Sequence, residues 1–164
     1  EITDDTQLFI KQTDQYIKEN YGEEVSRNKF IWGASMGGRV CYEITKKDNK
    51  DCKGVIFMVP GFGVEESFLK LPPGESAKAV SNNPECVEKI GLINYGVDPE
   101  SFMVLMNYFI KTPEDFNTYE APFQVSVAGS DQLVPPMLQY SIYEKAQSKV
   151  KEVQYYPDMW HAFQ

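Results

Sequence analysis

The chain has 164 residues, and 42% of them are hydrophobic, which is enough apolar material for one packed domain and too much for a disordered chain. Its formal net charge of -8 disfavours nucleic acid and anionic membrane surfaces as main partners. No apolar run approaches the roughly 20 residues that a membrane-spanning helix needs, so we expect no transmembrane segment.

The cysteines and the histidine limit the chemistry that is available. Cys41, Cys52 and Cys86 form an odd set without the paired spacing of a metal site. Free cysteines fit a reducing compartment, and we expect a cytoplasmic or other intracellular location. The one histidine, His161, cannot build a histidine-rich metal site by itself. Cys41 falls in a helical pattern and is expected in the core.

The first part of the chain predicts alternating helices and strands. Apolar residues at helical spacing indicate a helix over 5–21, with Gly22 just beyond its end. The nearly continuous apolar run KFIWGA (29–34) is typical of a strand buried on both faces. A helix follows over 36–47, and GVIFMVP (54–60) predicts a second buried strand.

The last part of the chain repeats this alternation. FQVSVAG (123–129) predicts a third buried strand, residues 138–150 predict a helix, and KEVQYYP (151–157) predicts a strand near a sheet edge. Strands that alternate with helices argue for a mostly parallel, doubly wound α/β sheet covered on both faces.

A long insertion separates the two parts. Residues 61–120 contain the turn signals PPG, NNP and NYG and one apolar helical segment, SFMVLMNYFI. This insertion is too long for a plain connection, so we expect a helical cap. The predicted organisation is therefore a core over 1–60, the cap over 61–120, and the rest of the core over 121–164.

The stretch FIWGASMGGRVCYE (30–43) carries a Gly-x-Ser-x-Gly motif between a predicted strand and a predicted helix. A sharp strand-to-helix turn strains Ser35 and crowds the two backbones, and Gly33 and Gly37 would relieve that crowding. The helix that starts after Ser35 would aim the N–H of Met36 at a developing oxyanion. The alternative is a glycine turn with an incidental serine.

A nucleophilic serine needs a histidine base, which in turn needs a carboxylate, and in this kind of fold they follow in the order serine, acid, histidine. Asp131 follows the third predicted strand, and His161 follows the last one. The carboxyl ends of parallel strands share one edge of a sheet, so these groups can converge with Ser35. Alternatives remain open: Asp131 as a helix cap, His161 as a surface residue, and Asp158 as a rival acid.

The motifs GASMGG, AGSDQLVPP and WHAF, in that order and with a predicted cap before the acid strand, resemble the α/β-hydrolase superfamily. Their layout is similar to that of its monoacylglycerol lipase and lysophospholipase-like serine hydrolases. The resemblance implies an α/β-hydrolase fold with Ser35 as nucleophile, Asp131 as acid, His161 as base and Met36 as an oxyanion donor. It further implies cleavage of lipid esters such as monoacylglycerol or lysophospholipid through an acyl-enzyme, without a metal or organic cofactor.

The predicted cap is the expected source of acyl contacts. Its apolar helix offers six such side chains: Met103, Leu105, Met106, Tyr108, Phe109 and Ile110. Met103, Met106 and Phe109 are the expected substrate-binding residues. The alternative is that this helix packs a core of its own.

The resemblance is incomplete at the start of the chain. A second oxyanion donor is expected near a His-Gly motif after an earlier strand, and no His-Gly dipeptide occurs. We therefore expect the chain to be the C-terminal part of a longer protein and to be inactive on its own. A different class stays open, namely a hydrolase-fold domain that serves as a non-catalytic structural or binding subunit of a larger assembly.

Overall fold

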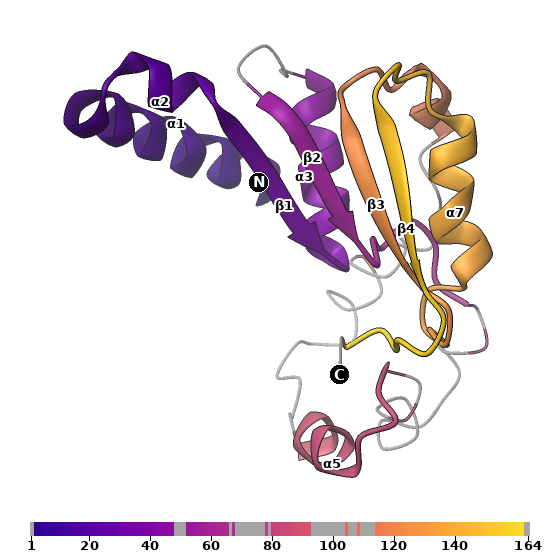
Figure 1. The fold of residues 1–164 in the computed structure, drawn as a ribbon. Coiled ribbons are helices and arrows are strands. Elements are labelled where there is room, and N and C mark those ends of the chain that lie inside the picture. The colour runs from indigo at the N-terminus through magenta and orange to yellow at the C-terminus, as the bar shows by residue number, and fades with distance from the viewer. Residues whose placement is uncertain are drawn as a thin grey trace.

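The computed structural model describes residues 2–47, 52–65, 67, 78, 80–92, 104, 108 and 114–162. Its elements in chain order are α1 (Ile2–Tyr21), α2 (Glu23–Arg27), β1 (Lys29–Ala34), α3 (Met36–Lys47), β2 (Cys52–Met58), α5 (Pro84–Leu92), the 3-10 helix η2 (Glu114–Thr118), β3 (Phe123–Ala128), α7 (Pro136–Lys145) and β4 (Lys151–Tyr156). The described strands form one sheet in the order β1-β2-β3-β4, and all neighbours are parallel (Figure 1). The predicted parallel α/β sheet is confirmed.

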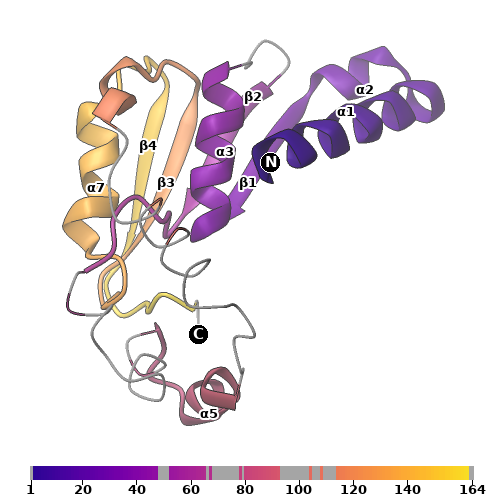
Figure 2. The same ribbon diagram turned by 180° about the vertical axis from the view of Figure 1, so that it is seen from behind.

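The hydrophobic core lies between the sheet and the helices α3 and α7, which cover the same face (Figure 2). Aromatic side chains dominate this core: Tyr42, Phe57, Phe62, Phe116, Tyr119 and Phe123. The rings of Tyr42 on α3 and Phe116 on η2 stack with centroids 4.7 Å apart. Because aromatic pairs of this kind bury large areas, they attach the end of the insertion to the helix that follows Ser35.

The opposite face of the sheet carries no described helix (Figure 1). Phe30 and Trp32 of β1 are 68% and 60% exposed there. The prediction that residues 29–34 are buried on both faces is therefore wrong for the described part of the chain. The reason is that α3 packs on one face of β1, while no described element packs on the face that carries Phe30 and Trp32.

The helix α7 differs from its predicted range of 138–150. It begins at Pro136, where a proline is suited to the first turn because the missing N–H would have no helical acceptor. It ends at Lys145, and Ala146 is already extended. The ammonium of Lys151 donates to the carbonyls of Tyr143 and Ala146 at 2.7 and 2.8 Å, which satisfies this end of the helix.

The part of the insertion that contains α5 lies beyond the carboxyl ends of the strands (Figure 1). Asn83 caps α5, since its Oδ1 accepts the backbone N–H groups of Glu85 and Cys86. The N–H of Ala162 donates to the carbonyl of Val80 at 3.0 Å and joins the insertion to the last loop. Figure 1 shows α5 below the sheet, on the side to which the strands point. Among the described helices, none combines the length and the hydropathy that crossing a membrane would require.

Candidate active site

Ser35 occupies the sharp turn between β1 and α3. Its φ of 51° lies in the left-handed region, which a serine adopts only when its surroundings hold it there. Its N–H donates to the carbonyl of Met58 at 3.0 Å. Its own carbonyl accepts the N–H groups of Gly61 at 2.8 Å and Gly38 at 3.0 Å. The strand β2 and the loop after it therefore hold the serine backbone in this conformation.

Two of the glycines around Ser35 are required by close contact. A Cβ on Gly33 would lie 2.3 Å from the carbonyl oxygen of Gly37 and 2.6 Å from the Sγ of Cys41. A Cβ on Gly38 would lie 2.8 Å from the Cβ of Pro60. At Gly37, by contrast, a Cβ would meet no atom within 4 Å, so the predicted crowding at that position is not found.

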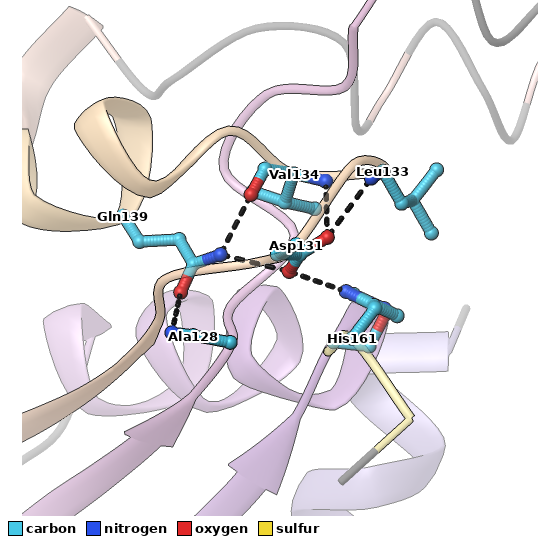
Figure 3. A network of polar contacts seen from close by, with 7 residues as sticks. Ala128, Asp131, Leu133, Val134, Gln139 and His161 are labelled. Carbon is cyan, nitrogen blue, oxygen red and sulfur yellow. Dashed lines mark hydrogen bonds and ion pairs between the residues drawn. The ribbon is translucent and has the colours of Figure 1, made fainter. Parts of the chain in front are cut away.

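Asp131 lies in the loop between β3 and α7, and both of its carboxylate oxygens accept hydrogen bonds (Figure 3). Its Oδ1 accepts the backbone N–H groups of Leu133 and Val134, both at 2.9 Å. Its Oδ2 accepts the Nε2–H of Gln139 at 2.8 Å. Since all three partners are N–H donors, the site suits the ionised carboxylate.

His161 joins this carboxylate to the serine. Its Nδ1 lies 2.8 Å from Oδ2 of Asp131, and its Nε2 lies 2.8 Å from Oγ of Ser35. An ionised carboxylate only accepts hydrogen bonds, so Nδ1 carries the proton and Nε2 is left as an acceptor for the serine hydroxyl. The imidazole is 7% exposed and the Asp131 side chain is fully buried. Three residues that are far apart in the sequence thus form one hydrogen-bonded chain.

The other residues predicted for the site are the oxyanion donor, the rival acid and the cap residues. Met36 is the first residue of α3, so its N–H belongs to the first turn and has no acceptor within the helix. Asp158 is exposed, and the carboxylate at hydrogen-bond distance from Nδ1 of His161 is that of Asp131. Among the predicted cap residues, Tyr108 is described, and the guanidinium of Arg39 lies 4.7 Å from its ring centroid. The remaining predicted cap residues lie outside the described residues: Met103, Leu105, Met106, Phe109 and Ile110.

Two further groups bear on the site. Cys41 is buried in the core, and burial raises the pKa of its thiol from 9.0 to about 11, which disfavours the reactive thiolate. Gln139 bonds to Asp131 and was not predicted, because its position in the predicted helix carried no sign that its side chain turns back into the acid loop. Within the described ranges, no group of three or more His, Cys, Asp and Glu side chains is placed to hold a metal ion.

A parallel sheet with a strained serine between strand and helix, and with an aspartate and a histidine in the loops after later strands, defines an α/β hydrolase. The family model described as serine aminopeptidase, S33, matches residues 1–164, which is the whole chain. The chain belongs to this family of α/β hydrolases. The comparison with curated proteins gave no match.

Solved structures share the fold at low sequence identity. Monoacylglycerol lipase from Paleococcus ferrophilus is 18% identical with a TM-score of 0.62, and the match covers 93% of this chain and 66% of that chain. A soluble variant of monoglyceride lipase from Saccharomyces cerevisiae, in complex with a substrate analog, is 17% identical with a TM-score of 0.64, covering 93% of this chain and 61% of that chain. An esterase from Exiguobacterium antarcticum is 9% identical with a TM-score of 0.65, and the match covers 93% of this chain and 65% of that chain. The chain thus spans about two thirds of the length of these structures.

Proposed function

We propose that the protein is a serine hydrolase that cleaves carboxylic esters, with Ser35 as nucleophile, His161 as general base and Asp131 as the acid of the triad. The observation that carries the proposal is the continuous hydrogen-bonded chain from Oδ2 of Asp131 through His161 to Oγ of Ser35, with both distances 2.8 Å. A serine hydroxyl is a weak nucleophile, and a neutral imidazole at hydrogen-bond distance is the group that activates it.

The reaction proceeds in two steps. Oγ of Ser35 attacks the ester carbonyl carbon while its proton moves to Nε2 of His161, and the N–H of Met36 donates to the developing oxyanion. His161 then gives the proton to the departing alcohol, which leaves an acyl group on Ser35. A water molecule, deprotonated by His161, releases the carboxylic acid and restores the serine.

A lipid-like ester is the proposed substrate. Two of the structural neighbours are a monoacylglycerol lipase and a monoglyceride lipase, which supports a small ester of a long-chain acid as substrate. The segment 61–120 is proposed as a cap, because α5 lies beyond the carboxyl ends of the strands and Val80 is bonded to the loop of His161. The free thiols of Cys41, Cys52 and Cys86 support an intracellular location.

The test uses the full-length protein, a p-nitrophenyl ester and a fluorophosphonate probe that labels activated serines. We expect labelling at Ser35, and Ser35→Ala should lower kcat by several orders of magnitude because the triad acts as a unit. Ser141→Ala is the matched control, since Ser141 is equally half-buried and donates to the carbonyl of Leu138 in α7. Unchanged turnover in Ser35→Ala would refute the assignment.

Two other outcomes would change the substrate or the class. The family description names a serine aminopeptidase, so an amino-acid p-nitroanilide is tested beside the ester. Cleavage of the anilide but not of the ester would make an amide the proposed substrate, with the same three residues in the same roles. No labelling of the intact protein by the probe would favour a non-catalytic subunit of an assembly.

A further inference from the structure

Gln139 is a polar side chain with 0% exposure in the second turn of α7. Burial of an amide costs free energy unless its donors and its acceptor all find partners. Its side chain points from α7 into the loop that carries Asp131 (Figure 3). A residue in this place can act on the carboxylate from behind, on the side away from Ser35.

All the polar groups of this amide are used. Nε2 donates to Oδ2 of Asp131 at 2.8 Å and to the carbonyl of Val134 at 2.6 Å. Oε1 accepts the N–H of Ala128, the last residue of β3, at 3.1 Å. A flipped amide would place its oxygen against two acceptors and its NH2 against a donor, so the network allows one orientation. Gln139 therefore ties the end of β3, the acid loop and α7 together.

The two oxygens of Asp131 are held in different ways. Oδ1 is held by backbone N–H groups of its own loop, which would remain with any side chain at position 139. Oδ2 is the oxygen that faces His161, and the Gln139 amide is its other partner. The direction in which Oδ2 presents itself to the imidazole thus depends on Gln139.

We propose that Gln139 is a positioning residue for the triad, an inference that rests on the proposed function. Its amide fixes the carboxylate so that Oδ2 accepts Nδ1–H of His161, and this keeps Nε2 aimed at Ser35. The bond from Gln139 to Asp131 also stabilises the negative charge that must balance the imidazolium during the reaction. Gln139 touches neither Ser35 nor the substrate, so it acts through Asp131.

The main experiment measures kcat and KM of Gln139→Met and Gln139→Glu in the full-length protein. Methionine has a similar length and no amide, while glutamate keeps the shape and an acceptor for Ala128 but replaces the donor by an oxygen. We expect kcat to fall by about 10-fold or more with KM within a factor of about two, since loss of the hydrogen-bond partner of a metal ligand, which orients a functional side chain in a similar way, typically costs about 10–100-fold.

The control is Thr45→Val. Thr45 is also 0% exposed, and its hydroxyl bonds to Tyr119 at 2.7 Å and to the carbonyl of Cys41, away from the triad. Loss of a buried hydrogen bond there should lower stability and leave kcat per folded molecule unchanged. An equal fall of kcat in Thr45→Val would show that Gln139 acts only through stability, and would overturn the proposal.

A second measurement reads the hydrogen bond itself and is independent of turnover. The low-field proton resonance of His161 Nδ1–H, assigned by its loss in His161→Ala, should move or broaden in Gln139→Glu and stay in place in Thr45→Val. An unmoved resonance together with unchanged kcat would overturn the positioning role. That outcome differs from failure of the proposed function, in which the wild-type protein itself neither labels at Ser35 nor hydrolyses the ester.

Discussion

The strands β1 and β3 run parallel in one sheet, and each leads into a turn that carries a residue of the proposed triad, yet they hold that residue by different means. In β3 five of the six residues are buried, while in β1 one of six is buried. Asp131 is bonded by its own loop and by the helix that follows it. Ser35 is bonded by β2 and by the loop after β2.

This difference shows that the acid side of the site is built locally and the nucleophile side is not. Apart from His161, the groups that bond to the carboxylate all belong to the segment from β3 to α7. The serine, by contrast, depends on the correct pairing of β1 with β2 and on the close contact of Gly33 with α3. Changes in the acid loop should therefore act mainly on chemistry, and changes at the turn between β1 and α3 should act on both chemistry and folding.

The largest expected effect tests the acid side. Asp131→Asn should lower kcat by about 10⁴-fold, because an amide cannot fix the imidazole tautomer as the carboxylate does. Asp158→Asn is the control, since Asp158 is exposed and lies three residues before His161. It should change kcat by less than about twofold. Steady-state kinetics of the full-length protein measure kcat of both variants. A larger loss in Asp158→Asn than in Asp131→Asn would identify Asp158 as the acid.

The second prediction compares one residue type in the two strands. Phe123 of β3 is 4% exposed and Phe30 of β1 is 68% exposed. Phe123→Ala should lower the free energy of unfolding by about 3–5 kcal/mol through loss of burial and creation of a cavity. Phe30→Ala should change it by about 0.5 kcal/mol or less. Urea denaturation of the intact protein measures both, and equal losses would mean that another part of the protein covers β1.

Much of the fold could be predicted because local sequence signals coincide with the elements. The run KFIWGA matches β1, the helix over 36–47 matches α3, and the alternating pattern of KEVQYYP correctly indicated an edge strand. These elements follow from apolar spacing and from the Gly-x-Ser-x-Gly turn, which act over a few residues. The exposure of Phe30 and Trp32 could not be predicted, because burial depends on what packs against a strand.

The juxtaposition of the candidate site residues was predictable to a similar extent. Ser35, Asp131 and His161 each follow a strand, so the topology of a parallel sheet brings them together. Gln139 could not be found in the same way, since it lies inside a helix and its role depends on the path of the loop before that helix. The helix α2 was also missed, because five residues are too short to show a periodic pattern.

The third prediction tests the tight contact that fixes the nucleophile side. Gly33→Ala should cost about 1–3 kcal/mol of stability, because the new methyl group would meet the backbone of Gly37 at 2.3 Å. Gly37→Ala is the control, since its Cβ would meet no atom within 4 Å. It should be neutral or stabilising by up to about 1 kcal/mol, as alanine favours a helix more than glycine. Equal costs in urea denaturation would show that the two backbones are not in close contact.

The smallest expected effect concerns pH and the thiol of Cys41, which lies on α3 against β1. Burial raises the pKa of Cys41 from 9.0 to about 11, so the folded protein keeps the neutral thiol while the unfolded chain ionises first. A raised pKa adds stability that is fully present below about pH 9 and is lost as the pH rises toward 11. This one group should therefore lower the free energy of unfolding by about 1 kcal/mol between pH 8 and pH 10.

Cys41→Ala should remove that part of the decline, and the pH dependence of urea denaturation in the two proteins measures the difference. The same slope in both would mean that the thiol titrates normally, and that water reaches α3 past the edge strand β1.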